Sequence, residues 1–366
     1  MKAVQSRSVF PLHYYGHKAA LLREILSLVP PDAQTFLDPF CGTGIVAWTA
    51  KRLGMRVVVN DVLLSAHLRH RALIANNHIL LDENDHCLLT GNRAAQGHFH
   101  ARYLASLGKR NAEFLDTLTQ SIPQLSGQFK QDIATIVPCL VAMENLKFDC
   151  IRFTPSGAFT GGQNLRAVDI EAEFAKFVRH RLPLLVCDNK QDNEAHQQDA
   201  LRLIESVMAD VLYVDTPYVC RAGSYEGMYS CWDDWCRLLQ GRHGEIINSY
   251  DGKADLAPYA RFDRRTSAIL GFMRLFKQAA HIPTVIVSYN TTSGIAPVEL
   301  EEIARSFGRT VTTKKIPYPL PTISKTKPRF TDEVLIKAVS TRPTIINFSN
   351  AMLESQPDIT SDAQAA

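Results

Sequence analysis

The chain has 366 residues, of which 46% are hydrophobic and 21% charged, so its composition excludes an intrinsically disordered protein. Forty lysines and arginines stand against 37 aspartates and glutamates, which gives a formal net charge of +3. A nucleic-acid site would therefore be a local basic patch and not a uniformly basic surface. A chain of this length is expected to form about two domains.

The sequence carries no sign of export or membrane insertion. Its first residues, MKAVQSRSVFPLHYYGHK, lack the apolar stretch of a secretory signal, and no apolar run approaches the roughly 20 residues that cross a bilayer. We therefore expect a cytoplasmic protein that does not associate with membranes. The eight cysteines form no CxxC pair and the histidines show no metal-binding spacing, so we expect reduced thiols and no metal.

The first part of the chain has the pattern that opens a parallel α/β sheet. Apolar residues at helical spacing predict a helix over 18–29, which a Pro-Pro pair ends. TFLD at 35–38 predicts a strand and is followed by a glycine turn. A helix over 45–54 and a second strand over 55–61 come next.

Residues 84–180 are more polar and partly helical, and we interpret them as an inserted domain with a glycine-rich loop, GAFTGGQN, at 157–164. The α/β pattern then returns. Its predicted elements are LPLLV at 182–186, a strand within 210–218, a helix over 266–280, and strands at 284–290 and 333–339.

Two segments near the end of the chain have unusual compositions. Residues 309–330 hold six Lys/Arg, no acid and four prolines, which predicts a stiff basic loop between two strands. Residues 343–366 contain no Lys or Arg, and we expect the tail to be partly disordered.

The segment DPFCGTG, at 38–44, has the features of a nucleoside-binding turn. Glycines at 42 and 44 let the backbone approach a ligand where a Cβ atom would collide. Asp61 ends the next predicted strand, where an acid accepts hydrogen bonds from ribose hydroxyls. Both the GxGxxG fingerprint and the GxxxxGK[ST] phosphate loop are absent, which favours S-adenosylmethionine over NAD. A glycine turn that only packs a helix on the sheet is the alternative.

The predicted strand VLYV, at 211–214, delivers Asp215 and Tyr218 at its carboxyl end, where open α/β sheets bind ligands. This pair suits chemistry on an exocyclic amine such as adenine N6, whose lone pair is delocalised into the ring. Hydrogen bonds from the amine to a carboxylate and to a main-chain carbonyl localise that lone pair and stabilise the charge that develops. Tyr218 offers a face on which an extruded base stacks. The alternative is a strand-ending turn with a core tyrosine.

Three motifs in a particular order carry a family resemblance. YGHK at 15–18 comes first, FLDPFCGTG at 36–44 second, and VDTPY at 214–218 last, after the insertion. This order resembles that of the Dam-like (alpha-group) DNA adenine-N6 methyltransferases, and the resemblance covers roughly residues 10–80 and 185–338.

The resemblance implies an α/β fold with a Rossmann-like methyltransferase sheet flanked by helices. It implies an S-adenosylmethionine-dependent catalytic domain formed by 10–83 and 181–340, an inserted and mostly helical target-recognition domain over 84–180, and a tail over 341–366.

The resemblance also implies roles for single residues. Lys18 would lie near the methionine carboxylate of the cofactor, Asp61 would bind its ribose, and Asp199 would reach its adenine. The implied cofactor-binding residues are Tyr15, Lys18, Asp38, Phe40, Cys41, Gly42, Thr43, Gly44, Asp61 and Asp199. The implied catalytic residues, which need no metal, are Asp215, Thr216, Pro217 and Tyr218.

The sequence departs from the family pattern in three places. His17 stands in the usual Gly-Gly-Lys motif, and Thr216 replaces the first proline of Asp-Pro-Pro-Tyr, where it keeps the carbonyl acceptor but frees φ. DPFCGTG is closer to the wording of cytosine-N4 and some RNA guanine-N2 methyltransferases.

Three groups of residues are candidates for contact with nucleic acid. The basic residues of 309–330 can track phosphates; they are Arg309, Lys314, Lys315, Lys325, Lys327 and Arg329. Gln163 and Asn164 can pair with adenine edges. Loop 219–235, with Tyr225, Tyr229, Trp232 and Trp235, would close over a flipped base, with core packing of these rings as the alternative.

Together these patterns predict an enzyme that transfers a methyl group from S-adenosylmethionine to adenine N6 in duplex DNA by base flipping, with a cognate restriction endonuclease as a candidate partner. Three alternatives stay open at this point. The acceptor is cytosine N4 in DNA or an exocyclic amine in RNA; the chain is a catalytically weak, nucleic-acid-binding relic of the fold; or the chain is a nicotinamide-dependent enzyme.

Overall fold

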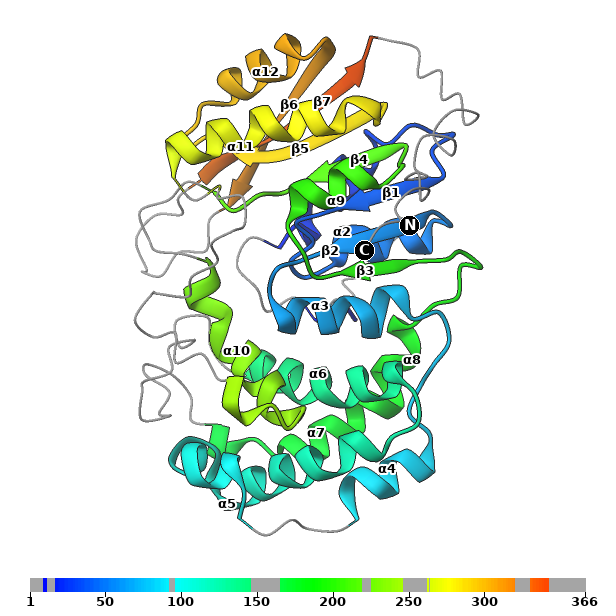
Figure 1. The fold of residues 1–366 in the computed structure, drawn as a ribbon, viewed down its shortest axis with the longest axis vertical. Coiled ribbons are helices and arrows are strands. Elements are labelled where there is room, and N and C mark those ends of the chain that lie inside the picture. The colour runs from blue at the N-terminus through cyan, green and yellow to red at the C-terminus, as the bar shows by residue number, and fades with distance from the viewer. Residues whose placement is uncertain are drawn as a thin grey trace, which may run out of the picture.

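The centre of the protein, seen in a computed structural model, is a seven-stranded sheet of order β3-β2-β1-β4-β5-β7-β6 (Figure 1). The strands are β1 (Thr35–Asp38), β2 (Arg56–Asn60), β3 (Glu194–His196), β4 (Val211–Val214), β5 (Thr284–Asn290), β6 (Arg309–Pro319) and β7 (Phe330–Ser340). The structure describes residues 9–11, 17–91, 96–145, 165–218, 225–245, 262, 264–319 and 330–341.

Helices cover both faces of this sheet, and the α/β fold expected from the sequence is confirmed. They are α1 (Leu22–Leu26), α2 (Ile45–Arg52), α3 (Leu64–His70), α4 (Glu83–Thr90), α5 (His98–Ser121), α6 (Gln128–Asn145), α7 (Ile170–Lys176), α8 (Leu182–Leu185), α9 (Ala200–Ser206), α10 (Tyr225–Leu239), α11 (Arg265–Gln278) and α12 (Pro297–Ser306). Among the described residues, no helix has the length and apolar character needed to cross a membrane.

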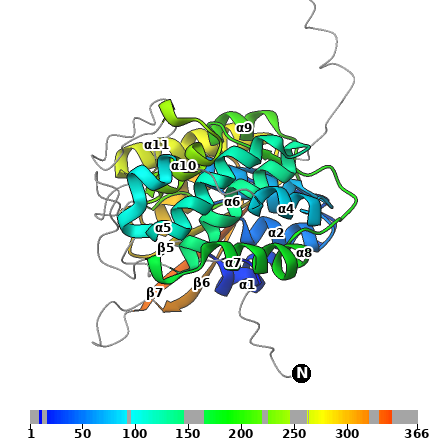
Figure 2. The ribbon, with the colours of Figure 1, turned by 90° about the horizontal axis from the view of Figure 1, so that it is seen from below.

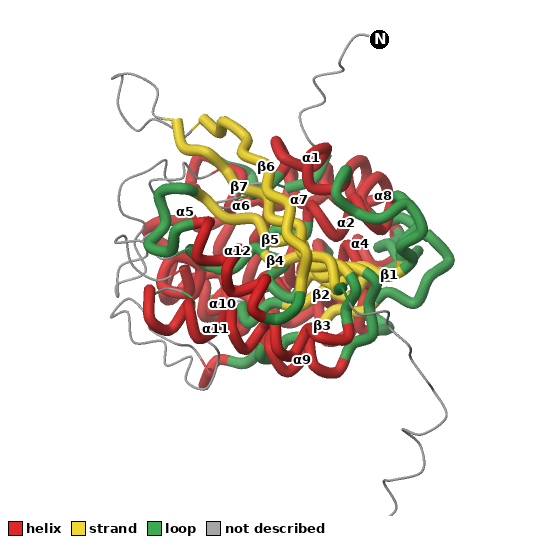
Figure 3. The backbone as a smooth tube through the Cα atoms, turned by 90° about the horizontal axis from the view of Figure 1, so that it is seen from above, coloured by secondary structure: helices red, strands yellow, loops and turns green. Residues whose placement is uncertain are grey.

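Alternate residues of the central strands enter two separate hydrophobic cores, because successive side chains of a strand point to opposite faces. In β4, Val211 and Tyr213 belong to one core, and Leu212 and Val214 to the other. Helices α1 and α2 lie on one side of the strands and α9, α11 and α12 on the other, as the view from above shows (Figure 3). All four side chains of this strand are therefore buried, which explains its unbroken apolar sequence.

The direction of the strands places the predicted site residues at one edge of the sheet. Strands β1 to β5 are parallel, so the residues that follow β1, β2 and β4 gather at a common edge. From β1 the sheet continues to β2 and β3 on one side, and from β4 it continues to β5 on the other. The boundary between β1 and β4 is therefore a topological switch point, where open α/β sheets bind ligands. Strand β7 is antiparallel to β5, so its first residues reach this same edge.

A second layer of helices lies on the far side of α3 from the sheet. Helices α4 to α8 and α10 fill the lower half of the molecule, and the view from below shows α5, α6 and α7 in front of the strands (Figures 1 and 2). The described parts of 84–180 are thus helical, as predicted. The domain boundaries at 83/84 and 180/181 stay predictions.

A buried carboxylate joins this helical layer to the sheet. Asp233 of α10 accepts hydrogen bonds from the backbone N–H groups of Leu64 and Ser65, at 2.9 and 2.8 Å, and from Ser65 Oγ at 2.7 Å. It therefore caps the first turn of α3, whose N–H groups have no partner within their own helix.

The prediction of a loop over 309–330 is wrong for residues 309–319. Residues 309–319 form β6, because their β-branched residues suit a strand and an edge strand tolerates Pro317 and Pro319. Arg309 is buried and donates to main-chain carbonyls such as that of Ala279, at 2.5 Å, so it does not track phosphates. The predicted elements at 157–164 and 343–366, and residues 320–329, lie outside the described residues.

Two further segments differ from the sequence prediction. Most of 219–235 is not a loop: α10 begins at Tyr225, and Tyr229, Trp232 and Trp235 are buried in the core, so the core-packing alternative holds for these three rings. The three-residue strand β3 has no apolar pattern and was not expected. LPLLV at 182–186 forms the short helix α8.

The cap on α3 predicts a loss of stability on substitution. Asp233→Ala leaves two buried N–H groups without an acceptor, so the free energy of unfolding should fall by about 1–3 kcal/mol. Urea unfolding of the purified protein measures this change. Asp32→Ala, at an exposed aspartate, is the control and should stay within about 0.5 kcal/mol of the wild type. Equal effects of the two substitutions would contradict the capping role.

Candidate active site

A tight glycine turn connects β1 to α2. Gly42 and Gly44 have φ angles of 53° and 87°, and Gly44 N donates to Cys41 O at 2.8 Å. A Cβ atom on Gly44 would lie 2.8 Å from Ile74 Cδ1 and 3.3 Å from the His70 ring. Both the backbone conformation and the close packing therefore require glycine at 44.

The side chain of His70 packs against this turn and contacts its backbone. Its Nε2 lies 2.9 Å from the carbonyl oxygen of Gly42, and burial lowers the pKa of His70 to about 3. The imidazole is therefore neutral, and the contact to a carbonyl requires the proton to sit on Nε2. Sequence reasoning missed this role, because nothing in the sequence distinguishes His70 from His67 of the same helix.

Asp38, the last residue of β1, has the arrangement of a ligand-binding carboxylate. It is buried, and its Oδ1 has no hydrogen-bond partner among the described residues. Burial, with Asp215 nearby, raises the pKa of Asp38 well above its usual value. A buried carboxyl left with a free acceptor is costly unless a donor, such as the amino group of a ligand, completes it.

Asp61 and Asp199 follow β2 and β3 and already hold main-chain groups. Asp61 accepts from Gly42 N and Leu63 N, each at 3.0 Å, and burial raises its pKa to about 6. Asp199 accepts from Leu201 N at 2.9 Å as the N-cap of α9. Carboxylate oxygens have further lone pairs, so their predicted contacts to ribose and adenine remain predictions.

The other residues of the turn are packed within it. Cys41 and Thr43 are buried, and Thr43 Oγ1 accepts from Ile45 N at 3.3 Å at the start of α2. Phe40 packs edge-on against Phe262, with ring centroids 5.2 Å apart. Tyr15 lies outside the described residues.

The predicted catalytic motif lies beside this turn, at the carboxyl end of β4. Asp215 pairs with Lys18, whose Nζ is 2.8 Å from Asp215 Oδ2. The side chain of Lys18 is 6% exposed and that of Asp215 is 19% exposed, so the carboxylate is the member of the pair that a substrate can reach. Burial raises the pKa of Asp215 and the Lys18 ammonium opposes that rise. The sequence analysis assigned Lys18 to the cofactor and did not foresee this ion pair.

Glu333, from β7, completes the cluster and was also missed. Its Oε1 accepts from Tyr218 Oη at 2.6 Å and from Ser288 Oγ at 2.9 Å, and lies 3.8 Å from Lys18 Nζ. Burial raises the pKa of Glu333. A signal was present in the sequence, because an acid is unusual at the start of an apolar strand such as EVLIKAV.

Thr216 and Pro217 separate the two catalytic side chains. Thr216 is buried, and its Oγ1 has no hydrogen-bond partner among the described residues. Tyr218 packs edge-on against Tyr289, with centroids 5.1 Å apart, and the Lys18 ammonium lies 5.1 Å from the Tyr218 ring centroid. These two contacts fix the orientation of the Tyr218 ring beside Asp215.

The candidate nucleic-acid contacts are only partly described. Lys314 and Lys315 are exposed on the edge strand β6. The remaining candidates, Gln163, Asn164, Lys325, Lys327 and Arg329, lie outside the described residues.

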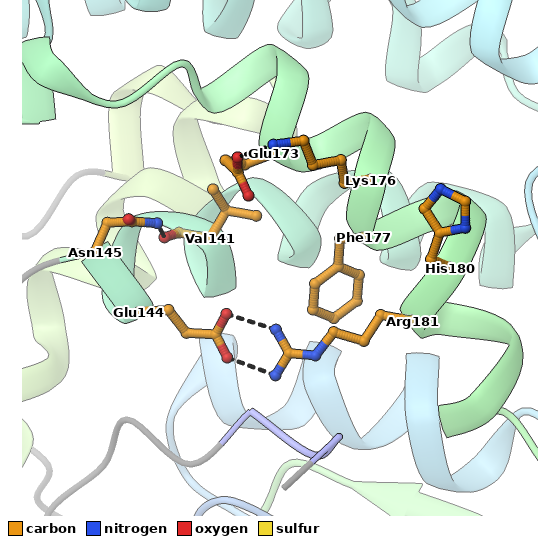
Figure 4. A pocket seen from close by; sticks show the side chains of 8 residues that line it. All are labelled: Val141, Glu144, Asn145, Glu173, Lys176, Phe177, His180 and Arg181. Atoms are coloured by element: carbon orange, nitrogen blue, oxygen red, sulfur yellow. Dashed lines mark hydrogen bonds and ion pairs between the residues drawn. The ribbon is translucent and has the colours of Figure 1, made fainter. Parts of the chain in front are cut away.

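A cavity of about 300 Å³ lies far from these motifs, in the helical layer (Figure 4). Glu144 of α6 and Arg181 line it side by side and form two hydrogen bonds of 2.6 Å. Arg181 Nε also donates to Val9 O at 2.7 Å, so this pair anchors the chain near its N-terminus. No residue of the predicted site lines this cavity.

Comparison with known proteins decides the family. The model of the D12 class N6 adenine-specific DNA methyltransferases matches residues 14–233, which include the glycine turn and the DTPY motif. The chain belongs to this family. It is therefore an adenine-N6-specific DNA methyltransferase, and the expected resemblance to Dam-like enzymes is confirmed.

Individual relatives agree with this assignment. The type II methyltransferase M2.HphI of Haemophilus parahaemolyticus is 25% identical over 84% of this chain and 91% of its own length. The modification methylase StsI of Streptococcus sanguinis is 26% identical and the type II methyltransferase M.FokI of Planomicrobium okeanokoites 25% identical, again over 84% of this chain. The chain spans about half the length of these last two relatives, 48% and 49%.

A methyl group added at Gly44 should impair both stability and cofactor binding, whereas one added at Gly54 should impair stability alone. Gly44→Ala should lower the free energy of unfolding by about 1–2 kcal/mol through its positive φ, and should weaken binding of S-adenosylmethionine because the turn must shift. Urea unfolding and calorimetry measure the two effects. Gly54→Ala is a matched control, with a φ of 94° and no atom within 4 Å of the added Cβ. It should lose similar stability and keep its cofactor affinity; a loss of affinity there would refute the explanation.

The ion pair predicts a shift in pH dependence. Lys18 lowers the pKa of the Asp215 carboxyl, which the predicted catalytic role requires in its ionised form. Lys18→Met should therefore raise the pKa further and move the acid limb of the kcat/KM profile to higher pH. Steady-state kinetics across pH measures the limb, with exposed Lys277→Met as the control that should leave it in place. A limb that stays put or moves to lower pH in Lys18→Met would contradict the pairing.

Proposed function

We propose that this enzyme transfers a methyl group from S-adenosylmethionine to adenine N6 in duplex DNA, after flipping the base out of the helix, and that it acts in the cytoplasm. The observation that carries the proposal is the set of contacts made by the two carboxylate oxygens of Asp215. Lys18 holds its Oδ2, while Oδ1 has a long contact of 3.3 Å to Tyr218 Oη and the side chain is 19% exposed.

The residues at the sheet edge fit the proposed cofactor. The free acceptor of Asp38 suits the amino group of the methionine part, and the glycines at 42 and 44 leave room for its backbone atoms. Asp61 and Asp199 would serve ribose and adenine through their remaining lone pairs. When bound, S-adenosylmethionine supplies an electrophilic methyl group on a sulfonium.

The catalytic residues would act mainly by position and charge. Asp215 Oδ1 would accept a hydrogen bond from the adenine amine, which localises the nitrogen lone pair and stabilises the developing positive charge. The carbonyl of Thr216 or Pro217 would accept the second amine hydrogen. The Tyr218 ring would stack on the extruded base, whose removal from the duplex costs a few kcal/mol. No strong base is required, because the amine loses its proton only after it becomes cationic.

DNA contacts would come from two regions. Lys314 and Lys315 project from an edge strand and would meet phosphates, as would Lys325, Lys327 and Arg329. The segment 84–180, with Gln163 and Asn164, would recognise the target sequence as a separate domain. A restriction endonuclease of the same specificity would be the partner, since one relative carries the name of a modification methylase.

The assay uses labelled S-adenosylmethionine and unmethylated genomic DNA, followed by nucleoside digestion and mass analysis. N6-methyladenine in duplex DNA is the expected product. N4-methylcytosine, or a product formed only on single strands or RNA, would contradict the proposal.

Replacement of the catalytic carboxylate tests its role. Asp215→Asn and Asp215→Ala should reduce kcat by at least about a hundredfold, because the acceptor charge is lost, and should leave cofactor binding largely intact. Product formation and calorimetric binding measure the two quantities. Exposed Asp32→Asn is the control and should keep full activity. An Asp215→Ala enzyme that methylates at the wild-type rate would remove Asp215 from the mechanism.

A further inference from the structure

The hydroxyl of Tyr218 lies between two carboxylates but has only one proton to donate. Its oxygen is 2.6 Å from Glu333 Oε1 and 3.3 Å from Asp215 Oδ1. The shorter distance is that of a charge-assisted hydrogen bond, while the longer one exceeds the usual range for O–H···O bonds. The proton therefore belongs to the contact with Glu333.

This choice of partner matters for Asp215. Lys18 already occupies Oδ2, so Oδ1 is the oxygen left to accept a hydrogen bond from a substrate amine. If the phenol donated to Oδ1 instead, the substrate amine would have to compete with it for the acceptor.

We propose that Glu333 is a positioning residue that accepts the hydrogen bond of the Tyr218 hydroxyl and so keeps Asp215 Oδ1 free for the target amine. The inference rests on the proposed function and extends it to a residue outside all three sequence motifs.

The surroundings of Glu333 fit this role. Ser288 of β5 donates to the same Oε1 at 2.9 Å, which fixes the carboxylate against the neighbouring strand. The register pairs Glu333 with Asn290 at the end of β5, so the side chain reaches the catalytic edge only because β7 runs antiparallel. The side chain is 5% exposed, so solvent does not replace Tyr218 as its partner.

The test is a double-mutant cycle on the full-length enzyme. It compares wild type, Glu333→Ala, Tyr218→Phe and the double variant, each assayed for kcat and KM on unmethylated DNA. Tyr218→Phe keeps the ring and removes the proton in question. Tyr213→Phe, which removes the hydroxyl of another buried tyrosine on the catalytic strand, is the matched control.

Glu333→Ala should lower kcat by about 10- to 100-fold, since Tyr218 then turns to Asp215 Oδ1 and competes with the amine. The double variant should recover to within about threefold of Tyr218→Phe alone, because no phenol remains to compete. Glu333→Gln, which keeps an acceptor oxygen, should retain more activity than Glu333→Ala. In the control, Tyr213→Phe should not rescue Glu333→Ala.

Several results would overturn the proposal. They are an unchanged kcat in Glu333→Ala, a double variant whose losses multiply, and a rescue by Tyr213→Phe equal to that by Tyr218→Phe. Circular dichroism and cofactor binding check each variant for folding; if Glu333→Ala does not fold, the same cycle with Glu333→Leu, which also lacks an acceptor but fills the space of the side chain, decides the question. A wild-type enzyme that forms no N6-methyladenine would refute the proposed function itself, whereas an active wild type without rescue refutes only the role of Glu333.

Discussion

The ammonium group of Lys18 lies between one buried and one partly buried carboxylate at the centre of this enzyme. Lys18 lies 2.8 Å from Asp215 and 3.8 Å from Glu333, and all three side chains are largely removed from water. Buried charges of this kind are tolerated only when they are paired and hydrogen-bonded. The arrangement therefore depends on four parts of the chain meeting accurately: the segment before α1, the end of β4, the end of β5 and the start of β7.

The sheet supplies that accuracy. Strands β1, β2, β4 and β5 are packed on both faces, so two rigid hydrophobic cores fix the positions at which β1 and β4 end. The residues left over at the edge then divide into two kinds. Asp61 and Asp199 accept hydrogen bonds from main-chain groups and stabilise the turns, whereas Oδ1 of Asp38 has no hydrogen-bond partner in the part of the chain that the structure describes. A site of this design has its polar groups in place before the substrate arrives, which is where electrostatic catalysis gains most.

Much of this was predictable from sequence, because local patterns encode it. TFLD, VVVN, VLYV and TVIVSYN are strands whose apolar runs reflect burial on two faces, and the glycine turn and DTPY follow two of them. What sequence could not provide was pairing between distant segments. The prolines of β6 and the lack of apolar residues in β3 prevented the prediction of these two strands. The contact of Lys18, Asp215 and Glu333 depends on the order of the strands, which no local sequence pattern indicates. The aromatic residues of α10 were ambiguous for a related reason, since burial of Trp232 and Trp235 becomes visible only with their helical neighbours.

The late position of β7 in the chain has a consequence for biosynthesis. A ribosome delivers the glycine turn and the DTPY motif well before Glu333, and β7 then inserts between β5 and β6 rather than adding to the outside of the sheet. Until it does, β5 has an open edge, and such edges invite pairing with other chains. A growing polypeptide would thus hold the residues proposed to bind the cofactor and the base without Glu333, the residue proposed to keep the acceptor free. Under these proposals, methylation of DNA would begin only with completed chains.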